Sequence, residues 1–187
     1  MDVQVPPNEP LKIQKIIQTF QLIPHQEGGY FRETYRSGAK PMASHGLTDE
    51  SGDVMIPGGD RNSVRNVCTS IIYLMTKNSP IAFLHQNKSD IVRYHQGGGT
   101  VLVYTVSPDG RLHQHRLGMD FNAGDVLQLV TPGGFWEALE LVGGDWALQG
   151  EAVAPGFDYR DMTLGTKTTL LQFSEEIRDI LQFYIHC

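Results

Sequence analysis

A histidine and an asparagine two residues apart, His85 and Asn87, are the residues in this sequence best placed to do chemistry. Histidine is the side chain whose unperturbed pKa lies nearest to neutral pH. In a partly dry pocket, a neutral His85 could take a proton from a carbon next to a carbonyl, and a tyrosine on an adjacent strand could return one from the other side. Tyr73, Tyr94 and Tyr104 are the candidate acids, although a tyrosine in a strand is also a common core or rim residue.

Other side chains could hold a small polar ligand beside this histidine. Arg65 and Arg93 could each bind a phosphate or a carboxylate by bidentate hydrogen bonds, although Arg93 could instead pair with Asp90 on the surface. Aromatic rings offer flat apolar walls for a sugar or a base. We therefore predict that the catalytic residues are His85, Tyr94 and Tyr104, and that the ligand-binding residues are Arg65, Tyr73, Phe83, Asn87, Arg93, Trp136 and Glu137.

The composition excludes several classes of partner. The 187 residues carry a formal net charge of -6 without a Lys/Arg cluster, and binding to a phosphate backbone needs a basic surface. No apolar run approaches the ~20 residues that span a bilayer, and residues 1–7 lack a signal pattern. Two distant cysteines, Cys68 and Cys187, fit a reducing compartment. We expect a cytoplasmic protein with no nucleic-acid partner and no membrane partner.

One helix is predicted near each end of the chain. Near the N-terminus, Leu11, Ile16, Ile17 and Phe20 form an imperfect apolar stripe. Near the C-terminus, Ser174 caps a helix over residues 174–185, whose apolar face should lie on the barrel or on a partner subunit. That face consists of Ile177, Ile180, Leu181, Tyr184 and Ile185.

Between these helices the hydrophobic pattern has a period of two, which is typical of strands. Many short strands, separated by turns rich in Gly, Pro and Asp, predict an antiparallel β-sandwich or barrel. The polar segment 38–63 interrupts the pattern as a long loop, which could cover the barrel mouth or be an inert insertion. The predicted strands are Tyr30–Tyr35, Val67–Met75, Ile81–Leu84, Ile91–Tyr94, Val101–Val106, Leu112–Leu117, Val126–Val130, Phe135–Leu141 and Trp146–Val153.

Four motifs follow one another along the chain: LIPHQEGGYFRET at residues 22–34, FLHQN at 83–87, TPGGFWE at 131–137 and APGFD at 154–158. In this order they resemble a family of small cupins catalogued as a domain of unknown function. The resemblance covers about residues 20–165 and implies an all-β fold, a double-stranded β-helix or jelly-roll barrel with an N-terminal and a C-terminal helix. It also implies a single cupin domain over residues 1–187, but no settled activity.

The resemblance bears on metal binding as well. Cupins with a metal place two histidines and a glutamate in a first motif and a third histidine in a second. In this chain His85 and Asn87 take the two histidine positions, Ile91 stands in place of the glutamate, and Glu137 stands in place of the third histidine. We therefore predict no metal cofactor, although His85, Glu137 and the amide oxygen of Asn87 could hold a divalent cation weakly.

The motif Glu27–Thr34 opens the part of the chain that resembles cupins. In cupins such an N-terminal strand commonly crosses to a second subunit, so we expect a homodimer. Glu27, Arg32 and Glu33 could each reach the pocket, or could serve only the structure.

The sequence leaves more than one function open. The first hypothesis is an isomerase or epimerase that acts on a sugar phosphate or a sugar nucleotide with His85 as base, similar to the metal-free dTDP-sugar epimerase (RmlC-like) cupins. The carboxylate partner of such a base is missing, because Asp90 should lie on the opposite strand face. The second hypothesis is a cupin that binds a small ligand, such as a sugar phosphate, a nucleotide or a sugar, without catalysis. A third is a metal-dependent oxygenase.

Overall fold

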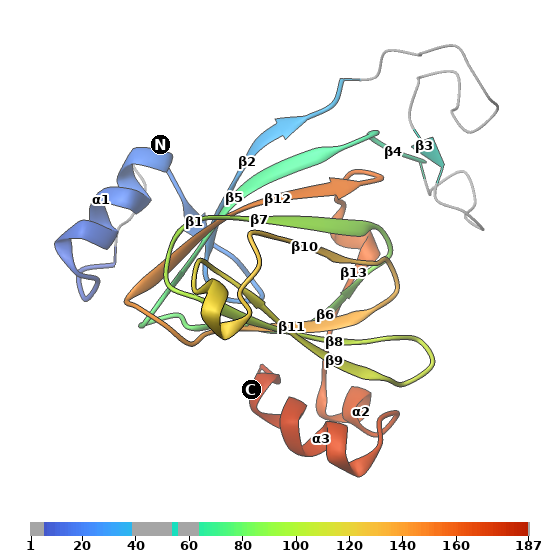
Figure 1. Ribbon diagram of the computed structural model, residues 1–187. Coiled ribbons are helices and arrows are strands. Elements are labelled where there is room, and N and C mark those ends of the chain that lie inside the picture. Colours follow the sequence, from blue (N-terminus) through green and yellow to red (C-terminus); the bar gives the residue numbers. More distant parts are fainter. Residues whose placement is uncertain (1–5, 39–53, 56–63, 187) are drawn as a thin grey trace.

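A computed structural model describes residues 6–38, 54–55 and 64–186 and shows two antiparallel sheets that face each other (Figure 1). The first sheet has the strand order β1-β2-β5-β12-β7-β10, and the second has the order β13-β6-β11-β8-β9. From β5 to β8 and from β10 to β13, successive strands alternate between the two sheets, as in a jelly roll. The predicted all-β jelly-roll fold is therefore confirmed. Most of the predicted loop 38–63 lies outside the described residues.

The strand bounds follow the predicted pattern closely. The first sheet contains β1 (Ile23–Pro24), β2 (Tyr30–Arg36), β5 (Thr69–Thr76), β7 (Asp90–Gly98), β10 (Gln128–Thr131) and β12 (Trp146–Ala154). The second contains β6 (Ile81–Asn87), β8 (Val101–Val106), β9 (Leu112–Leu117), β11 (Trp136–Leu141) and β13 (Met162–Leu164). A separate short pair consists of β3 (Val54–Met55) and β4 (Val64–Arg65). Because β2 pairs with β1 and β5 of its own chain, the crossing to a second subunit stays a prediction.

The N-terminal helix α1 (Leu11–Phe20) packs on the outer face of the first sheet. Its buried residues are Ile13 and Ile17, one helical turn apart, and they contact Leu74 of β5. Leu11 is 84% exposed, so its predicted place in the buried stripe was wrong. The reason is geometric, because the face centred on Ile13 and Ile17 turns Leu11 toward solvent.

The C-terminal helices cover the outer face of the second sheet (Figure 1). They are α2 (Lys167–Leu170) and α3 (Glu175–Leu181), followed by a 3-10 turn, η4 (Gln182–Tyr184), where the sequence predicted a continuous helix. Ser174 caps α3 as predicted, since its hydroxyl accepts the N–H of Ile177 at 3.5 Å. The apolar face of α3 packs on the barrel of its own chain. None of the described helices is long and apolar enough to cross a membrane.

Two β-bulges decide which side chains enter the barrel. In β6, the pairing with β11 shifts between Ala82 and His85, so that one extra residue separates them and both face inward. In β2, Thr34 is the extra residue between Glu33 and Tyr35 in the pairing with β5. This second bulge changes the inward set from odd to even residues and brings Arg36 to the pocket beside Glu33.

Half of the barrel interior is filled by an apolar core. Its members come from both sheets and include Tyr73 and Met75 of β5, Val103 of β8 and Leu139 of β11. Strand Trp146–Ala154 contributes Ala147 to this core and, further along the same inward face, Glu151 to a pocket. The packed half holds the sheets together, and the other half remains open to a ligand.

Candidate functional site

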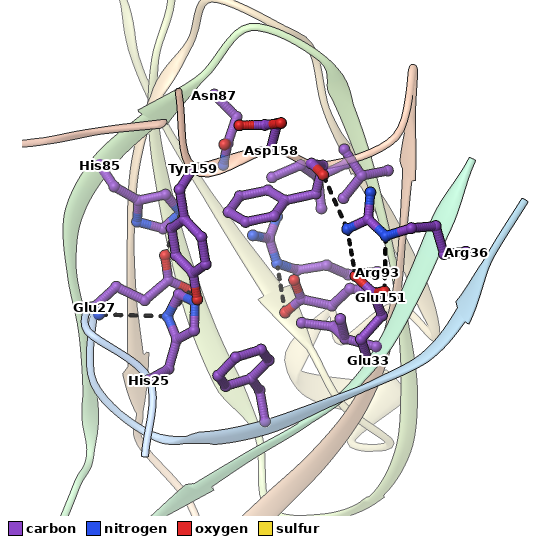
Figure 2. Close-up of a pocket in the computed structure, with 15 residues that line it drawn as sticks. His25, Glu27, Glu33, Arg36, His85, Asn87, Arg93, Glu151, Asp158 and Tyr159 are labelled. Atoms are coloured by element: carbon purple, nitrogen blue, oxygen red, sulfur yellow. Dashed lines mark hydrogen bonds and ion pairs between the residues drawn. The ribbon is translucent and has the colours of Figure 1, made fainter. Parts of the chain in front are cut away.

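The pocket in the open half of the barrel has a volume of about 320 Å³ (Figure 2). Volumes of roughly 300–1,000 Å³ are usual for sites that bind small molecules. Its apolar walls are Phe31, Ile71, Ile91, Val153 and Phe157. Its buried polar groups are His25, Glu27, His85, Asn87, Arg93 and Glu151, and its more exposed side chains are Glu33, Arg36, Asp158 and Tyr159.

The structure brings four of the predicted site residues together. His85, Asn87 and Arg93 line the pocket, and Glu137 lies beneath it with contacts to both His85 and Arg93. Arg93 is buried and bound to Glu137, so the alternative of a surface pair with Asp90 was wrong. Asp90 instead accepts the backbone N–H of Gly133.

Three predicted site residues lie on the outer faces of the sheets. Trp136 packs edge-on against Phe173, and Tyr104 packs against Tyr184, so both are covered by the C-terminal helices. Tyr94 follows Arg93 in β7 and is 42% exposed. Because side chains alternate across a strand, Tyr94 and Trp136 point away from the pocket that their neighbours Arg93 and Glu137 serve. This placement does not support Tyr94 or Tyr104 as the acid, or Trp136 as a wall for the ligand.

The remaining three predicted site residues serve the structure around the pocket. The hydroxyl of Tyr73 donates to the carbonyl of Gly28 at 2.8 Å, and the ring lies in the apolar core. Phe83 meets the ring of His186 edge-on. Arg65 binds the carboxylate of Asp161 through two nitrogens, with one contact of 2.9 Å. None of these three side chains lines the pocket.

A pair of glycines places Glu27 in the pocket. Gly28 and Gly29 have φ angles of +103° and +67°, which side chains rarely tolerate. A Cβ on Gly28 would also collide with the carbonyl oxygen of Ile81. The resulting turn directs the Glu27 carboxylate inward, while Arg32 stays exposed and binds Gln21. Of the three motif residues considered from sequence, Glu27 and Glu33 reach the pocket.

His85 lies between two buried carboxylates. Its Nε2 is 2.9 Å from Glu137 Oε1 and 3.3 Å from Glu27 Oε2, and its Nδ1 is 2.8 Å from the carbonyl oxygen of Phe83. Both ring nitrogens therefore face acceptors, and only the doubly protonated imidazolium can donate to both. Burial lowers the pKa of His85, but Glu27 and Glu137 outweigh it and raise the pKa to about 9. This environment favours the cationic form of His85 at neutral pH and does not support its use as a neutral base.

Arg93 continues the network on the other side of Glu137. Its two terminal nitrogens bind the Glu137 carboxylate at 2.8 and 2.7 Å, in the bidentate geometry that suits guanidinium. One of these nitrogens also donates to the hydroxyl of Thr131 at 3.1 Å. Despite its burial, Glu137 has a pKa well below the usual range because Arg93 and His85 are close. Glu137, on the neighbouring strand β11, is therefore the carboxylate partner of His85 that could not be identified from the sequence.

The network of ion pairs has Glu151 at one end and His25 at the other. At one end, Glu151 Oε1 is 3.4 Å from Arg93 Nε and has no hydrogen-bond partner among the described residues. At the other end, His25 Nδ1 is 3.4 Å from Glu27 Oε1, and His25 Nε2 is 3.3 Å from the hydroxyl of Tyr159. In Figure 2, His25 and Glu27 lie on one side of the pocket, and Arg93 and Glu151 on the other.

Both end groups are neutral, or partly neutral, near pH 7. Burial raises the pKa of Glu151 to about 7, although Arg93 acts in the opposite direction. Burial also lowers the pKa of His25, and the charge of His85 acts in the same direction, against the attraction of Glu27. The centre of the network balances two carboxylates, Glu27 and Glu137, with two cations, His85 and Arg93. The arrangement can therefore accept or release a proton at either end.

The His85 cation predicts that the protein loses stability in mild alkali. Because the pKa of His85 is raised from 6.5 to about 9, its contribution is complete below pH 6.5 and is lost as the pH rises through 9. At about 1.4 kcal/mol per pKa unit, the loss should approach about 3 kcal/mol. Glu151 also lowers the stability as the pH rises, but at lower pH than His85. Because its pKa is raised from 4.5 to about 7 in the folded protein, its ionisation over this range destabilises the folded state. Urea unfolding from pH 6 to 9.5 measures the effect.

Two variants separate this effect from general alkaline unfolding. His85→Gln should be less stable at pH 6 and, once Glu151 has ionised, should show little further loss between pH 8 and 9, where the wild-type protein still loses the contribution of His85. His113→Gln, which changes an exposed histidine of β9, should keep the wild-type profile. An unchanged pH profile in His85→Gln would show that His85 is not the group responsible.

The donor set does not fit a metal cofactor. Among the described residues, no group of three or more His, Cys, Asp or Glu side chains could hold a metal ion. Both nitrogens of His85 carry protons toward acceptors, and Glu137 is already bound by Arg93. The buried guanidinium of Arg93, bound to Glu137 at the position of the third metal-binding histidine, thus supplies the positive charge there.

Several pocket residues were missed from sequence. Glu151 gave one usable signal, a lone acidic residue in the middle of a strand with Gly150 and Ala152 as neighbours. His25 lies within a family motif but carried no other signal, and its Nδ1 accepts the backbone N–H of Glu27 at 3.3 Å. Arg36 gave no signal, because only the bulge at Thr34 turns it inward.

Comparisons with known proteins agree with this architecture. A family described as "Cupin superfamily (DUF985)" matches residues 14–165. An uncharacterized protein of Saccharomyces cerevisiae, YML079W, is 38% identical over 168 residues, which cover 86% of this chain and 79% of that protein. The crystal structure of protein SO0799 from Shewanella oneidensis matches with a TM-score of 0.74 and 25% identity, covering 92% of this chain and 96% of the other. A hypothetical protein from Leishmania major matches with a TM-score of 0.71 and 26% identity, covering 91% and 97%.

Proposed function

Since the chain belongs to the cupin family DUF985, we propose that its barrel pocket catalyses proton transfer on a small hydroxycarbonyl compound, as an isomerase or epimerase does. One observation carries the proposal. Two buried groups with shifted pKa values terminate the same network of ion pairs within one pocket: burial lowers the pKa of His25 and raises the pKa of Glu151 to about 7. Perturbed acids and bases that converge on a cleft are typical of active sites.

The proposed resting state has a neutral His25 and a protonated Glu151. A hydroxycarbonyl compound between them presents a C–H bond next to its carbonyl. His25 Nε2 accepts this proton, while the protonated Glu151 carboxyl group donates its proton to the carbonyl oxygen, which gives an enediol. Return of a proton from His25 to carbon, and of a hydroxyl proton to Glu151, completes the isomerisation and restores both groups. The first transfer leaves an imidazolium beside the Glu27 carboxylate and a Glu151 carboxylate beside the Arg93 guanidinium. Each product charge therefore forms next to an opposite charge that is already in place.

His85 has a different role in this scheme from the one expected from sequence. Its cation holds Glu27 and Glu137 in place, and both of its nitrogens are engaged by acceptors. His85 is therefore a positioning residue that keeps the Glu27 carboxylate beside His25, and the transferred protons belong to His25 and Glu151.

Deuterium exchange tests the proposal without knowledge of the substrate. The purified protein is incubated in D2O with a panel of aldoses, ketoses, their monophosphates and hydroxy ketones, and proton NMR follows each compound. We expect at least one compound to lose a C–H signal next to its carbonyl in a reaction that depends on the protein. The variant His25→Asn should slow this exchange by about 10²–10⁴-fold, the usual contribution of a positioned acid or base.

The variant His113→Asn provides the matched control, because His113 is an exposed histidine outside the pocket. It should exchange at the wild-type rate. Binding of a compound without any exchange would instead support a non-catalytic binding protein, the second function considered from sequence. Exchange that continues unchanged in His25→Asn would contradict the assigned role of His25.

A further inference from the structure

We infer that this pocket selects a small uncharged hydroxy compound, of about the size of a monosaccharide, over phosphorylated or carboxylated compounds. The inference deepens the proposed function and rests on it for the location of the ligand. It differs from the sugar phosphate or nucleotide expected from sequence. Three observations carry it: the charges in the pocket, its unpartnered atoms, and its size.

The charges of the described pocket disfavour an anion. Four carboxyl groups line it, from Glu27, Glu33, Glu151 and Asp158, and Glu137 lies directly beneath. The cations are already engaged, because protein carboxylates hold each of them at 2.6–2.9 Å. These pairs are Arg36 with Glu33, Arg93 with Glu137, and His85 with Glu137. A phosphate would have to compete with a carboxylate for every one of these cations.

The arginines expected to bind a phosphate illustrate this point. Arg65 is bound to Asp161 and lies outside the pocket lining. Arg93 has both terminal nitrogens on Glu137, and its remaining nitrogen faces Glu151 at 3.4 Å. Neither offers the open guanidinium fork that a phosphate or carboxylate ligand needs.

Two unpartnered oxygen atoms of pocket-lining residues call for hydrogen-bond donors, beside one unpartnered donor, Arg93 Nε. Asn87 and Glu151 line the pocket, and their buried atoms Asn87 Oδ1 and Glu151 Oε1 have no hydrogen-bond partner among the described residues. Both are oxygen atoms that accept hydrogen bonds, and buried acceptors without a donor are unfavourable. A ligand hydroxyl group supplies a donor, whereas an ionised phosphate or carboxylate group in its place supplies only acceptors.

The walls and the volume set the remaining features of the ligand. Phe31, Phe157 and the ring of Tyr159 give the pocket aromatic surfaces, on which the C–H face of a sugar ring can pack. The volume of about 320 Å³ is near the lower end of the range for small-molecule sites. A single sugar ring suits this space better than a sugar nucleotide does.

Matched pairs of ligands test the inference by binding alone. Glucose, fructose, ribose and xylose are each compared with a monophosphate and with the corresponding sugar acid, by ligand-observed NMR and calorimetry. We expect at least one uncharged sugar to bind at millimolar concentration or below, and its phosphate and acid to bind at least tenfold more weakly. The variant Glu151→Gln should reduce this discrimination, whereas Glu176→Gln, an exposed carboxylate of α3, should not change it.

The outcomes separate this inference from the proposed function. A phosphate or acid that binds more tightly than its parent sugar would overturn the inference, as would the absence of binding by every uncharged sugar. Binding of an uncharged sugar without deuterium exchange would leave the inference standing and would remove the proposed catalysis. Exchange on a phosphorylated compound alone would support the proposed catalysis and would overturn the inference about the ligand.

Discussion

Replacing Glu151 with glutamine should lower the rate of deuterium exchange by about 10²–10⁴-fold, the usual loss when a positioned acid or base is removed. Glutamine has nearly the same shape, but it can neither release nor accept a proton near pH 7. The pKa of Glu151, raised to about 7 by burial, is what allows the carboxyl group to do both. The measurement is the NMR exchange rate with whichever panel compound the wild-type protein acts on.

The pH profile of the same reaction gives a second readout. In the wild-type protein the exchange rate should fall as the pH rises through about 7, because Glu151 then loses the proton that it donates. Glu151→Gln should not show this fall. Glu176→Gln makes the same chemical change on the exposed surface of α3 and should keep both the rate and the profile. A Glu151→Gln protein with the full exchange rate would exclude Glu151 as the acid.

Replacing Arg93 with methionine should destabilise the protein by about 3–5 kcal/mol, which is the usual result when one partner of a buried ion pair is removed. Glu137 would then stay buried with only His85 and without its two hydrogen bonds to the guanidinium. Urea unfolding at pH 7 measures the loss. Arg111→Met is the control, because Arg111 is 77% exposed and pairs with Asp109 on the surface, where an ion pair contributes about 0–1 kcal/mol.

A double variant distinguishes a broken charge pair from lost packing. Arg93→Met combined with Glu137→Met removes both charges and fills the space with apolar atoms. It should recover at least half of the stability lost in Arg93→Met, since apolar replacement of a whole buried pair is often neutral. If the single variant does not fold, folding of the double variant gives the same answer. A single variant within 1 kcal/mol of the wild type would contradict the assigned role.

Much of the fold could be predicted from the sequence because the signal is local. The bounds of Val101–Val106 and Leu112–Leu117 were predicted to the residue, since alternation and a Pro-Asp-Gly turn define both strands. The short strand Met162–Leu164 was missed. Three residues are too few to show a period, and that strand exists because it pairs with the edge of β6.

The site was predictable only in part. The spacing of His85 and Asn87 correctly placed both in one pocket, because alternate residues of a strand share a face. The roles could not be predicted in the same way. The charge of His85 depends on Glu27 and Glu137, which are 58 and 52 residues away in the sequence and reach its ring from the turn before β2 and from β11.

By itself, the sequence determined the period of each strand, the capped C-terminal helix and the motifs of the family, because these depend on neighbouring residues. Tertiary structure decided which side chains meet. The bulges in β6 and β2 turn His85 and Arg36 inward, and the packing of the two sheets face to face joins His25 to Glu151 through one network of ion pairs. Protonation follows from those contacts, since burial and nearby charges set the pKa of each group. The base expected from sequence is therefore a cation in the folded protein.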